Sequence, residues 1–215
     1  MKPGRYYDID GRKLPSVTTV LKAIEQGDSL RRWRERLGDE EADRIMYERA
    51  EVGNLVHYWL SRWSCRKMGR PDPLLEFEPK PTPLTIARIL VKQLEVLLTN
   101  EGAIPLLSEE VVSNTEMGYA GRIDLFAEAK TIPTLFDLKT SKGVFGLDKW
   151  EAQVSAYLHC TVPDMSLVDK WTDAFGRVIR LHEDTGIEIV ELDLNRGWST
   201  FRAAFDIFRA QEENR

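Results

Sequence analysis

The sequence has few of the residues that build disulfide frameworks or thiolate metal sites. Its 215 residues contain two cysteines, Cys65 and Cys160, and three histidines. Two thiols alone cannot hold an iron–sulfur cluster or a tetrahedral zinc ion, and they are too few to form the disulfide framework of a secreted domain. We therefore expect no iron–sulfur cluster and an intracellular, cytoplasmic protein.

Long apolar runs are also missing. No stretch approaches the roughly 18 apolar residues that a membrane-spanning helix needs, and the opening residues 1–5 lack the apolar core of a signal peptide. We expect no membrane partner. With 42% hydrophobic residues, a chain of this length can bury a full core, and residues 1–215 are expected to form a single domain.

A net positive charge is absent as well, since the chain carries a formal charge of -5. The charge is uneven, however, because residues 1–70 hold 15 basic against 11 acidic side chains. Arg31, Arg32 and Arg34 surround Trp33, and a second basic group follows Trp59 and includes Trp63. Such a mixture suits phosphate contacts and base stacking. A solvated helix face whose tryptophans point into the core fits the same composition, so both interpretations stay open at this level.

Hydrophobic periodicity and turn signals predict an α/β (α+β) fold with a mixed sheet flanked by helices. Gly53 lies inside a predicted helix, where glycine costs about 1 kcal/mol relative to alanine, so we expect another segment or a ligand to approach near His57. Helices are predicted over residues 15–21, 29–37, 39–67, 84–99, 148–160 and 196–211. Strands are predicted over residues 5–14 (a hairpin), 105–113, 119–126, 135–140, 177–181 and 187–192, and residues 69–83 read as an extended connector.

The two strands that begin at residues 119 and 135 place acidic residues opposite each other. If the chain reverses at residues 130 and 131, Asp124 and Asp137 become cross-strand neighbours with Cβ atoms roughly 5 Å apart. The alternation of side chains puts Asp137 and Lys139 on one face and Leu138 on the other, which we expect to be apolar. Two carboxylates this close are unfavourable unless a cation or a proton lies between them. The hairpin therefore predicts a site for a hard divalent ion such as Mg²⁺ or Mn²⁺.

Asp124 followed by Asp137-Leu138-Lys139 resembles the D…(D/E)-x-K signature of the PD-(D/E)XK nuclease superfamily. Four further segments resemble motifs of its RecB-like exonuclease branch, which includes phage-type and mitochondrial genome maintenance exonucleases. In chain order they are Leu14-Pro15-Ser16-Val17-Thr18-Thr19, Gly53-x-x-x-His57, Gly118-Tyr119-Ala120-Gly121-Arg122-Ile123-Asp124 and Gln153-x-x-x-Tyr157. Each is weak alone, and their shared order over residues 6–192 carries the resemblance. It implies a restriction-endonuclease-like αβββαβ core over residues 84–212, preceded by a helical, DNA-guiding region over residues 1–70.

The resemblance also implies roles for single residues. Asp124, Asp137 and the Leu138 carbonyl would be metal ligands. His57 would contribute a nitrogen ligand or fix the geometry of the metal site. A glutamate on the preceding strand would join them, and the spacing to Gly121 and Asp124 favours Glu109 over Glu110. Lys139 would orient or deprotonate the attacking water, assisted by Gln153 and Tyr157 one helical turn apart. Nucleic-acid contacts are expected from Arg31, Arg32, Arg34, Arg122, Thr140, Ser141 and Lys142.

The expected function is a DNA exonuclease that depends on one or two Mg²⁺ or Mn²⁺ ions and prefers single strands or duplex ends. DNA recombination, repair or processing would be its setting, with recombination or replication proteins as partners and the host cytoplasm as its location if it is phage-encoded. Having two cysteines, the chain resembles the cluster-free relatives. Two alternatives remain: a nucleic-acid- or protein-binding module without hydrolysis, and a sequence-specific endonuclease.

Overall fold

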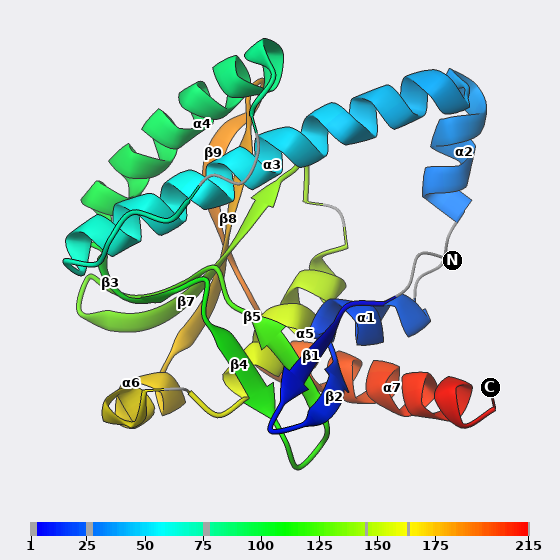
Figure 1. The fold of residues 1–215 in the computed structure, drawn as a ribbon, viewed down its shortest axis with the longest axis vertical. Helices are drawn as coiled ribbons and strands as arrows, with labels where there is room; N and C mark the ends of the chain where they lie inside the picture. Colours follow the sequence, from blue (N-terminus) through cyan, green and yellow to red (C-terminus); the bar gives the residue numbers. More distant parts are fainter. Residues whose placement is uncertain (1–3, 25–27, 75–77, 145, 163, 215) are drawn as a thin grey trace.

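The computed structural model describes residues 4–24, 28–74, 78–144, 146–162 and 164–214 (Figure 1). Its strands are β1 (Tyr6–Ile9), β2 (Arg12–Pro15), β3 (Ile104–Ser108), β4 (Val111–Asn114), β5 (Tyr119–Arg122), β6 (Leu125–Ala129), β7 (Ile132–Thr140), β8 (Phe175–His182) and β9 (Gly186–Glu191). Its α-helices are α1 (Val17–Leu21), α2 (Asp28–Leu37), α3 (Asp39–Lys67), α4 (Pro81–Asn100), α5 (Leu147–Leu158), α6 (Val168–Thr172) and α7 (Leu194–Glu213). Within those ranges, every helix is too short or too polar to span a lipid bilayer.

The central sheet has five strands in the order β3-β6-β7-β8-β9. β7 and β8 run parallel, whereas the other neighbours are antiparallel, so the sheet is mixed. Along the chain, α4, β3, β6, β7, α5 and β8 follow the expected order of one helix, three strands, one helix and one strand. The predicted α+β fold with a mixed central sheet is confirmed. Two small antiparallel sheets, β1-β2 and β4-β5, lie outside the central one.

Helices cover both faces of the central sheet, which separates two hydrophobic clusters (Figure 1). On β7, Leu135 joins the cluster formed with α1, α5 and α7, whereas Phe136 and Leu138 join the cluster formed with α3 and α4. An interior strand that is buried on both faces needs apolar residues at nearly every position. Asp137 and Lys139 are therefore the polar exceptions on the α5 side, and the face opposite them is apolar, as predicted.

The register of the β6–β7 hairpin matches the prediction. Leu125 pairs with Phe136, and Ala129 pairs with Ile132. The turn residues Lys130 and Thr131 both have positive φ, at 49° and 68°, as a two-residue hairpin turn with matching twist requires. The chain therefore reverses at the predicted position, which brings Asp124 and Asp137 to the same end of the hairpin.

The N-terminal predictions also agree with the structure. Asp10 and Gly11 form the turn of the β1–β2 hairpin with φ of 51° and 75°. The Ser16 hydroxyl accepts a hydrogen bond from the Thr19 amide and caps α1. Gly53 on α3 leaves space for Thr140, since an added Cβ would lie 3.3 Å from the Thr140 Oγ1 atom. The close approach near His57 is therefore made by the chain itself.

Two predicted strands are each divided in the structure. The segment over residues 119–126 forms β5 and then β6, and the segment over residues 105–113 forms β3 and then β4. The divisions lie side by side, because Glu109 donates its amide to the Asp124 carbonyl at 3.2 Å and Ile123 donates to the Glu110 carbonyl at 3.0 Å. Both segments leave the central sheet at this point and pair with each other as the separate β4–β5 sheet. The alternation of apolar and polar residues does not reveal this change.

Among the helices, one was not predicted and another begins three residues before its predicted start. α6 was not predicted, because its five residues are too short to show a helical period. α4 begins at Pro81 rather than at residue 84, since proline needs no amide partner in the first turn of a helix. The predicted connector over residues 69–83 is thereby shortened, and its residues 75–77 lie outside the described residues.

α5 and α7 pack together without space for a side chain at Gly197. A Cβ atom there would lie 2.3 Å from the Glu151 carbonyl oxygen on α5. The Glu151 carboxylate, 1% exposed, also binds Arg196 through contacts of 2.7 and 2.5 Å. The close approach therefore allows an ion pair between the buried Glu151 and the exposed Arg196 to join the two helices beside the glycine.

We predict that Gly197→Ala destabilises the protein by about 1–3 kcal/mol, because the methyl group must push α7 away from backbone atoms of α5. Urea-induced unfolding followed by circular dichroism measures the change. Ser199→Ala, at an exposed position on the same helix, is the matched control and should stay within about 0.5 kcal/mol of the wild type. Equal stability of Gly197→Ala and the control would contradict the packing described here.

Candidate metal centre

A cleft of about 640 Å³ opens at the end of the hairpin where β6 and β7 meet α3 and α5. Residues that the sequence singled out reach it from six parts of the fold: a helix on each face of the sheet, two strand breaks and two strands. They are His57, Glu109, Arg122, Asp124, Asp137, Leu138, Lys139, Gln153 and Tyr157. The cleft therefore collects all predicted catalytic residues and all predicted metal ligands.

Asp124 occupies the break between β5 and β6. Its Oδ2 atom accepts a hydrogen bond of 2.7 Å from the Leu138 amide, and its Oδ1 atom lies 3.3 Å from His57 Nδ1. The side chain thus continues the contact between the two strands where the β6–β7 ladder stops. Leu138 lines the cleft, and the role of its carbonyl as a ligand stays a prediction.

Glu109 completes a group of possible ligands with His57 and Asp124. One ligand atom from each of the three residues lies within 4.8 Å of the others. Glu109 Oε1 is buried, lies 3.4 Å from His57 Nδ1 and has no hydrogen-bond partner of good geometry among the described residues. A buried carboxylate oxygen without a donor, beside a second carboxylate and an imidazole, fits a divalent cation with oxygen and nitrogen ligands.

The neighbouring Glu110 points elsewhere. Its carboxylate pairs with Arg70 at 3.2 Å, and neither residue lines the cleft. Glu109 faces the cleft because its φ of 56° turns the chain at the break between β3 and β4. A non-glycine residue in this region is strained, and such residues cluster at functional sites. The structure therefore brings Glu109, not Glu110, to the other candidate ligands.

Asp137, Lys139 and Gln153 form a partly buried network on the other side of the cleft. Lys139 Nζ lies 2.6 Å from Asp137 Oδ2 and donates to Gln153 Oε1 at 3.1 Å. Gln153 Nε2 in turn donates to Asp137 Oδ1 at 2.7 Å and to the Tyr157 hydroxyl at 3.0 Å. One amide side chain therefore orients both the carboxylate and the ammonium.

The charges of the cleft shift one another. Burial, helped by repulsion from Asp124, outweighs the attraction of Lys139 and raises the pKa of Asp137 to about 6. Burial opposes the charged form of His57, but the Asp124 and Glu109 carboxylates prevail and raise its pKa to about 10. Burial likewise opposes ionisation of Lys139, yet the two aspartates raise its pKa above the usual value. In the metal-free protein, His57 and Lys139 are therefore cations at neutral pH.

Gly121 makes room for the Tyr157 ring. A Cβ atom on Gly121 would lie 2.3 Å from Tyr157 Cε1, so β5 and the ring can touch only because this position has no side chain. Tyr157 is buried, and burial followed by repulsion from Asp137 and Asp124 raises the pKa of its hydroxyl well above the usual value. The hydroxyl therefore stays protonated and can donate into the cleft.

The predicted nucleic-acid contacts are placed in different surroundings. Arg122 lines the cleft, whereas Arg31, Arg32, Arg34, Thr140, Ser141 and Lys142 do not. Arg34 pairs with Asp39 and Asp43 at 2.9 and 2.7 Å. Arg180 binds the Ser141 and Lys142 carbonyls, and the Lys142 ammonium lies 3.5 Å from Asp184. The contribution of these residues to nucleic-acid binding stays a prediction.

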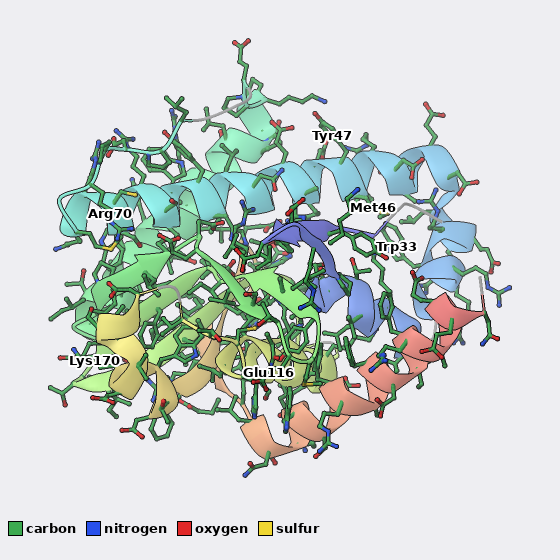
Figure 2. All side chains as sticks on the ribbon, turned by 60° about the horizontal axis from the view of Figure 1, so that its bottom comes forward. Trp33, Met46, Tyr47, Arg70, Glu116 and Lys170 are labelled. Carbon is green, nitrogen blue, oxygen red and sulfur yellow. The ribbon has the colours of Figure 1, made fainter. Side chains whose placement is uncertain are left out.

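Both interpretations of the Trp-bearing helices find support. Trp59 and Trp63 pack against the hydrophobic cluster under α3, as the solvated-face interpretation requires. Trp33, by contrast, lies on α2 at the end of α3 that is opposite to Arg70, near Met46 (Figure 2). Met46 and Tyr47 are 43% and 58% exposed. Exposed aromatic side chains therefore lie beside arginines at the far end of α3, and Arg62 also lies over the Trp59 ring, 5.1 Å from its centre.

Several polar residues of the cleft were not predicted. They come from the N-terminal hairpin, from α1 and from α3, and they are Arg5, Tyr7, Thr18, Asn54, Tyr58 and Ser61. Asn54 and Ser61 lie three residues before and four residues after His57, which places them on the same face of one helix. That spacing was a usable signal. Arg5 and Tyr7 reach the cleft through tertiary packing, and no local sequence pattern predicts their position there.

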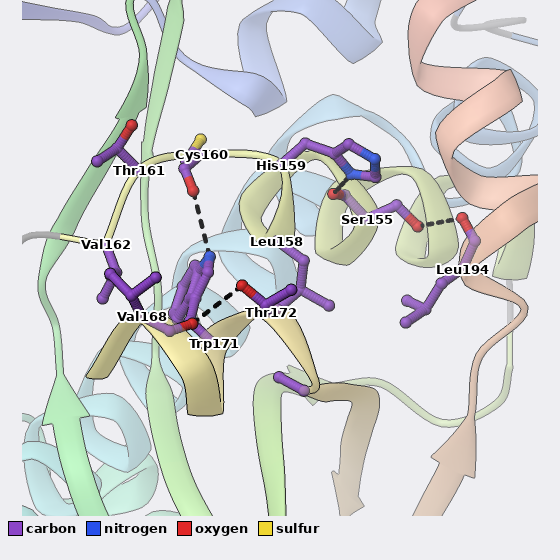
Figure 3. Close-up of a pocket in the computed structure, with 11 residues that line it drawn as sticks. Ser155, Leu158, His159, Cys160, Thr161, Val162, Val168, Trp171, Thr172 and Leu194 are labelled. Carbon is purple, nitrogen blue, oxygen red and sulfur yellow. Dashed lines mark hydrogen bonds between the residues drawn. The ribbon is translucent and has the colours of Figure 1, made fainter. Parts of the chain in front are cut away.

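Two other features are less suited to a cation. A hollow of about 560 Å³ lies between the end of α5, α6 and the start of α7, and none of the described residues that line it carries a carboxylate (Figure 3). Its polar groups bind each other, as Trp171 Nε1 does to the Cys160 carbonyl at 3.2 Å. His182, Glu183 and Asp184 also lie close together, but Glu183 pairs with Arg49 and Asp184 with Lys142.

Comparisons with known proteins give distant structural likenesses. No protein-family model and no curated protein matches the sequence. The crystal structure of SSO0001 is similar at 18% identity and a TM-score of 0.35, over 61% of this chain and 62% of that one. LHK-Exo in complex with dAMP is similar at 10% identity and a TM-score of 0.34, over 77% of this chain and 87% of that one. This chain therefore spans about three fifths of the SSO0001 chain, and neither likeness assigns a function.

We predict that the stability of the metal-free protein falls as the pH rises from about 6.5, the ordinary pKa of histidine, toward about 10, the pKa of His57 in the fold. A raised pKa stabilises the fold while the group stays protonated, and this contribution is lost as the pH passes the folded value. Thermal unfolding in the presence of a chelator measures the effect. His57→Gln should flatten the decline, and identical slopes in the two proteins would refute the pairing with Asp124 and Glu109.

We predict that Glu109→Gln weakens Mn²⁺ binding at least about tenfold, because even groups that only support metal ligands have effects of that size. Titration calorimetry on the metal-free protein measures the affinity. Glu110→Gln changes the neighbouring carboxylate, which pairs with Arg70 outside the cleft, and it should bind Mn²⁺ like the wild type. If only Glu110→Gln weakened Mn²⁺ binding, the metal ligand would be Glu110 and the assignment to Glu109 would be wrong.

Proposed function

We propose that this chain is a metal-dependent nuclease that hydrolyses phosphodiester bonds of DNA, acts from strand ends and favours single strands. The observation that carries the proposal is the convergence of three carboxylates, one imidazole and one lysine in a single cleft. Carboxylate clusters that hold divalent ions beside a lysine suit phosphoryl chemistry, because the reaction develops negative charge on oxygen.

His57, Glu109, Asp124 and Asp137 would hold one or two Mg²⁺ or Mn²⁺ ions, together with the Leu138 carbonyl. Such an ion, when bound, neutralises charge on the phosphate and makes a bound water more acidic. The buried Glu109 oxygen without a donor supports this ligand set. So does Asp137, since Asp124 helps to raise its pKa to about 6 after burial, and a cation would relieve that repulsion.

Lys139 would act on the phosphate and the attacking water as a fixed positive charge. Its ammonium lies between Asp137 and Gln153, and its raised pKa keeps it protonated at neutral pH. A protonated lysine orients water and stabilises developing charge, whereas proton abstraction would require the neutral amine. Gln153 would keep Lys139 and Asp137 in their relative positions, and Tyr157 would supply a donor from the adjacent turn.

Nucleic acid would reach the metal centre past residues of the N-terminal region, which we propose to belong to one domain with the nuclease core. Arg5 and Arg122 supply positive charge at the cleft, and Tyr7 and Tyr58 supply rings. Arginines follow a phosphate backbone, and aromatic rings stack on unpaired bases. This combination suits a single strand better than a duplex, whose bases are already stacked.

Two other functions fit parts of the geometry. A binding module on the same fold would keep the basic and aromatic lining but would have no need for the Lys139–Gln153 network. A sequence-specific endonuclease would use the same chemistry on internal bonds. A covalently closed circular substrate separates the latter from an exonuclease, which leaves the circle intact.

We predict that Asp137→Asn lowers DNA degradation at least about a hundredfold, because removing one group that acts on the developing charge costs that much. The assay follows end-labelled single- and double-stranded DNA with Mg²⁺ or Mn²⁺. Asp173→Asn, an exposed acid that does not line the cleft, serves as the control and should retain wild-type activity. Inactive wild type, or full activity of Asp137→Asn, would refute the nuclease.

A further inference from the structure

Arg122 binds one of the candidate metal ligands. Its Nε atom lies 3.0 Å from Glu109 Oε2, and the two side chains are 48% and 21% exposed. Arg122 ends β5, directly opposite Val111 of β4, and lines the cleft. Its guanidinium thus neutralises the carboxylate whose other oxygen faces His57.

A metal ion and Arg122 would compete for this carboxylate. An ion held by His57, Glu109 and Asp124 would place a double positive charge beside the guanidinium, and a half-exposed ion pair is too weak to resist that repulsion. The backbone that carries Glu109 is held in place, because its amide binds the Asp124 carbonyl at 3.2 Å and the Glu110 carbonyl accepts from Ile123 at 3.0 Å. The flexible arginine is therefore the partner that leaves.

Arg122 has a single ion-pair partner in the part of the chain that the structure describes, and that partner is Glu109. Once it leaves Glu109, the arginine therefore gives up this contact. Its guanidinium would then be a half-exposed cation at a cleft that holds a divalent ion. The group that binds both a guanidinium and such an ion is a phosphate, which accepts two parallel hydrogen bonds from arginine.

We propose that Arg122 is a phosphate ligand that the metal ion releases: it covers Glu109 in the metal-free protein and binds a nucleic-acid phosphate once the ion occupies the site. The proposal rests on the proposed nuclease function and adds its regulation. Because coupling between two ligands is reciprocal, nucleic acid must also strengthen metal binding through the same residue. The protein would thereby avoid holding DNA firmly before it can cleave it.

The first test measures the affinity for a short fluorescein-labelled single strand by anisotropy, with a chelator and with Ca²⁺. Ca²⁺ takes the same oxygen ligands as the proposed ions. The wild type should bind the strand more tightly with Ca²⁺ than with the chelator. In Arg122→Gln this ratio of affinities should be about tenfold smaller, as expected from the loss of one charge-assisted hydrogen bond. Arg122→Lys should recover part of this ratio, because lysine keeps the positive charge but cannot donate two parallel hydrogen bonds as a guanidinium does.

Arg70→Gln is the matched control. Arg70 pairs with Glu110 at 3.2 Å and is 49% exposed, so it has nearly the same contact and exposure as Arg122 but lies outside the cleft lining. Its variant should keep the full Ca²⁺-dependent gain. An equal loss in Arg70→Gln and Arg122→Gln would show a general charge effect and overturn the proposal.

The second test measures Mn²⁺ binding by calorimetry without nucleic acid. Arg122→Gln removes the cation that competes for Glu109, so it should bind Mn²⁺ several-fold more tightly than the wild type, while Arg70→Gln should not change. Weaker Mn²⁺ binding by Arg122→Gln would mean that the arginine supports the site rather than competing for it, which overturns the proposal.

The two proposals can fail separately. If the wild type binds no Mn²⁺ and degrades no DNA, the nuclease function fails and the release of Arg122 fails with it. If the wild type degrades DNA with Mn²⁺ but Arg122→Gln keeps the entire Ca²⁺-dependent gain in strand binding, only the release of Arg122 is overturned.

Discussion

The hydrogen bond from the Leu138 amide to Asp124 Oδ2, 2.7 Å long, fixes the end of the β6–β7 hairpin on which the candidate site is built. The backbone ladder between these strands ends with the pair Leu125 and Phe136. Beyond that pair, the Asp124 side chain replaces the missing backbone acceptor, which frees the chain before it to leave the central sheet. The same hydrogen bond holds the Asp124 carboxylate close to His57. One side chain therefore both closes the end of the hairpin and supplies a candidate metal ligand.

The opposite wall of the cleft depends on Gln153 in a similar way. Asp137 is 3% exposed, and a buried carboxylate beside a lysine is tolerated only if its remaining lone pairs find donors. The amide of Gln153 donates to Asp137 Oδ1 and accepts from Lys139, so a neutral side chain binds both members of the ion pair. α5 can supply it because Gly121 allows Tyr157, one turn further along, to lie directly against β5.

Local and near-local patterns predicted much of this arrangement, and tertiary structure decided the rest. The hairpin register followed from the position of the turn, and the face that carries Asp137 and Lys139 followed from alternation. The choice between Glu109 and Glu110 could not follow from alternation, because the positive φ of Glu109 interrupts the period at that residue. Arg5 and Tyr7 reach the cleft because the N-terminal hairpin packs beside it. This packing could not be predicted from the residue spacing around His57.

The charge pattern of the cleft explains how a fold with three inward carboxylates can exist without an ion. Each carboxylate has a cation from the chain itself: His57 for Asp124, Lys139 for Asp137 and Arg122 for Glu109. These partners differ in what they can do when a metal arrives. Lys139 is held by Gln153, and His57 can lose its proton and become a nitrogen ligand. Arg122 can do neither, since a guanidinium does not deprotonate and no described carboxylate other than Glu109 is in ion-pair contact with it. Of the three internal cations, it is the one that we propose a bound ion displaces.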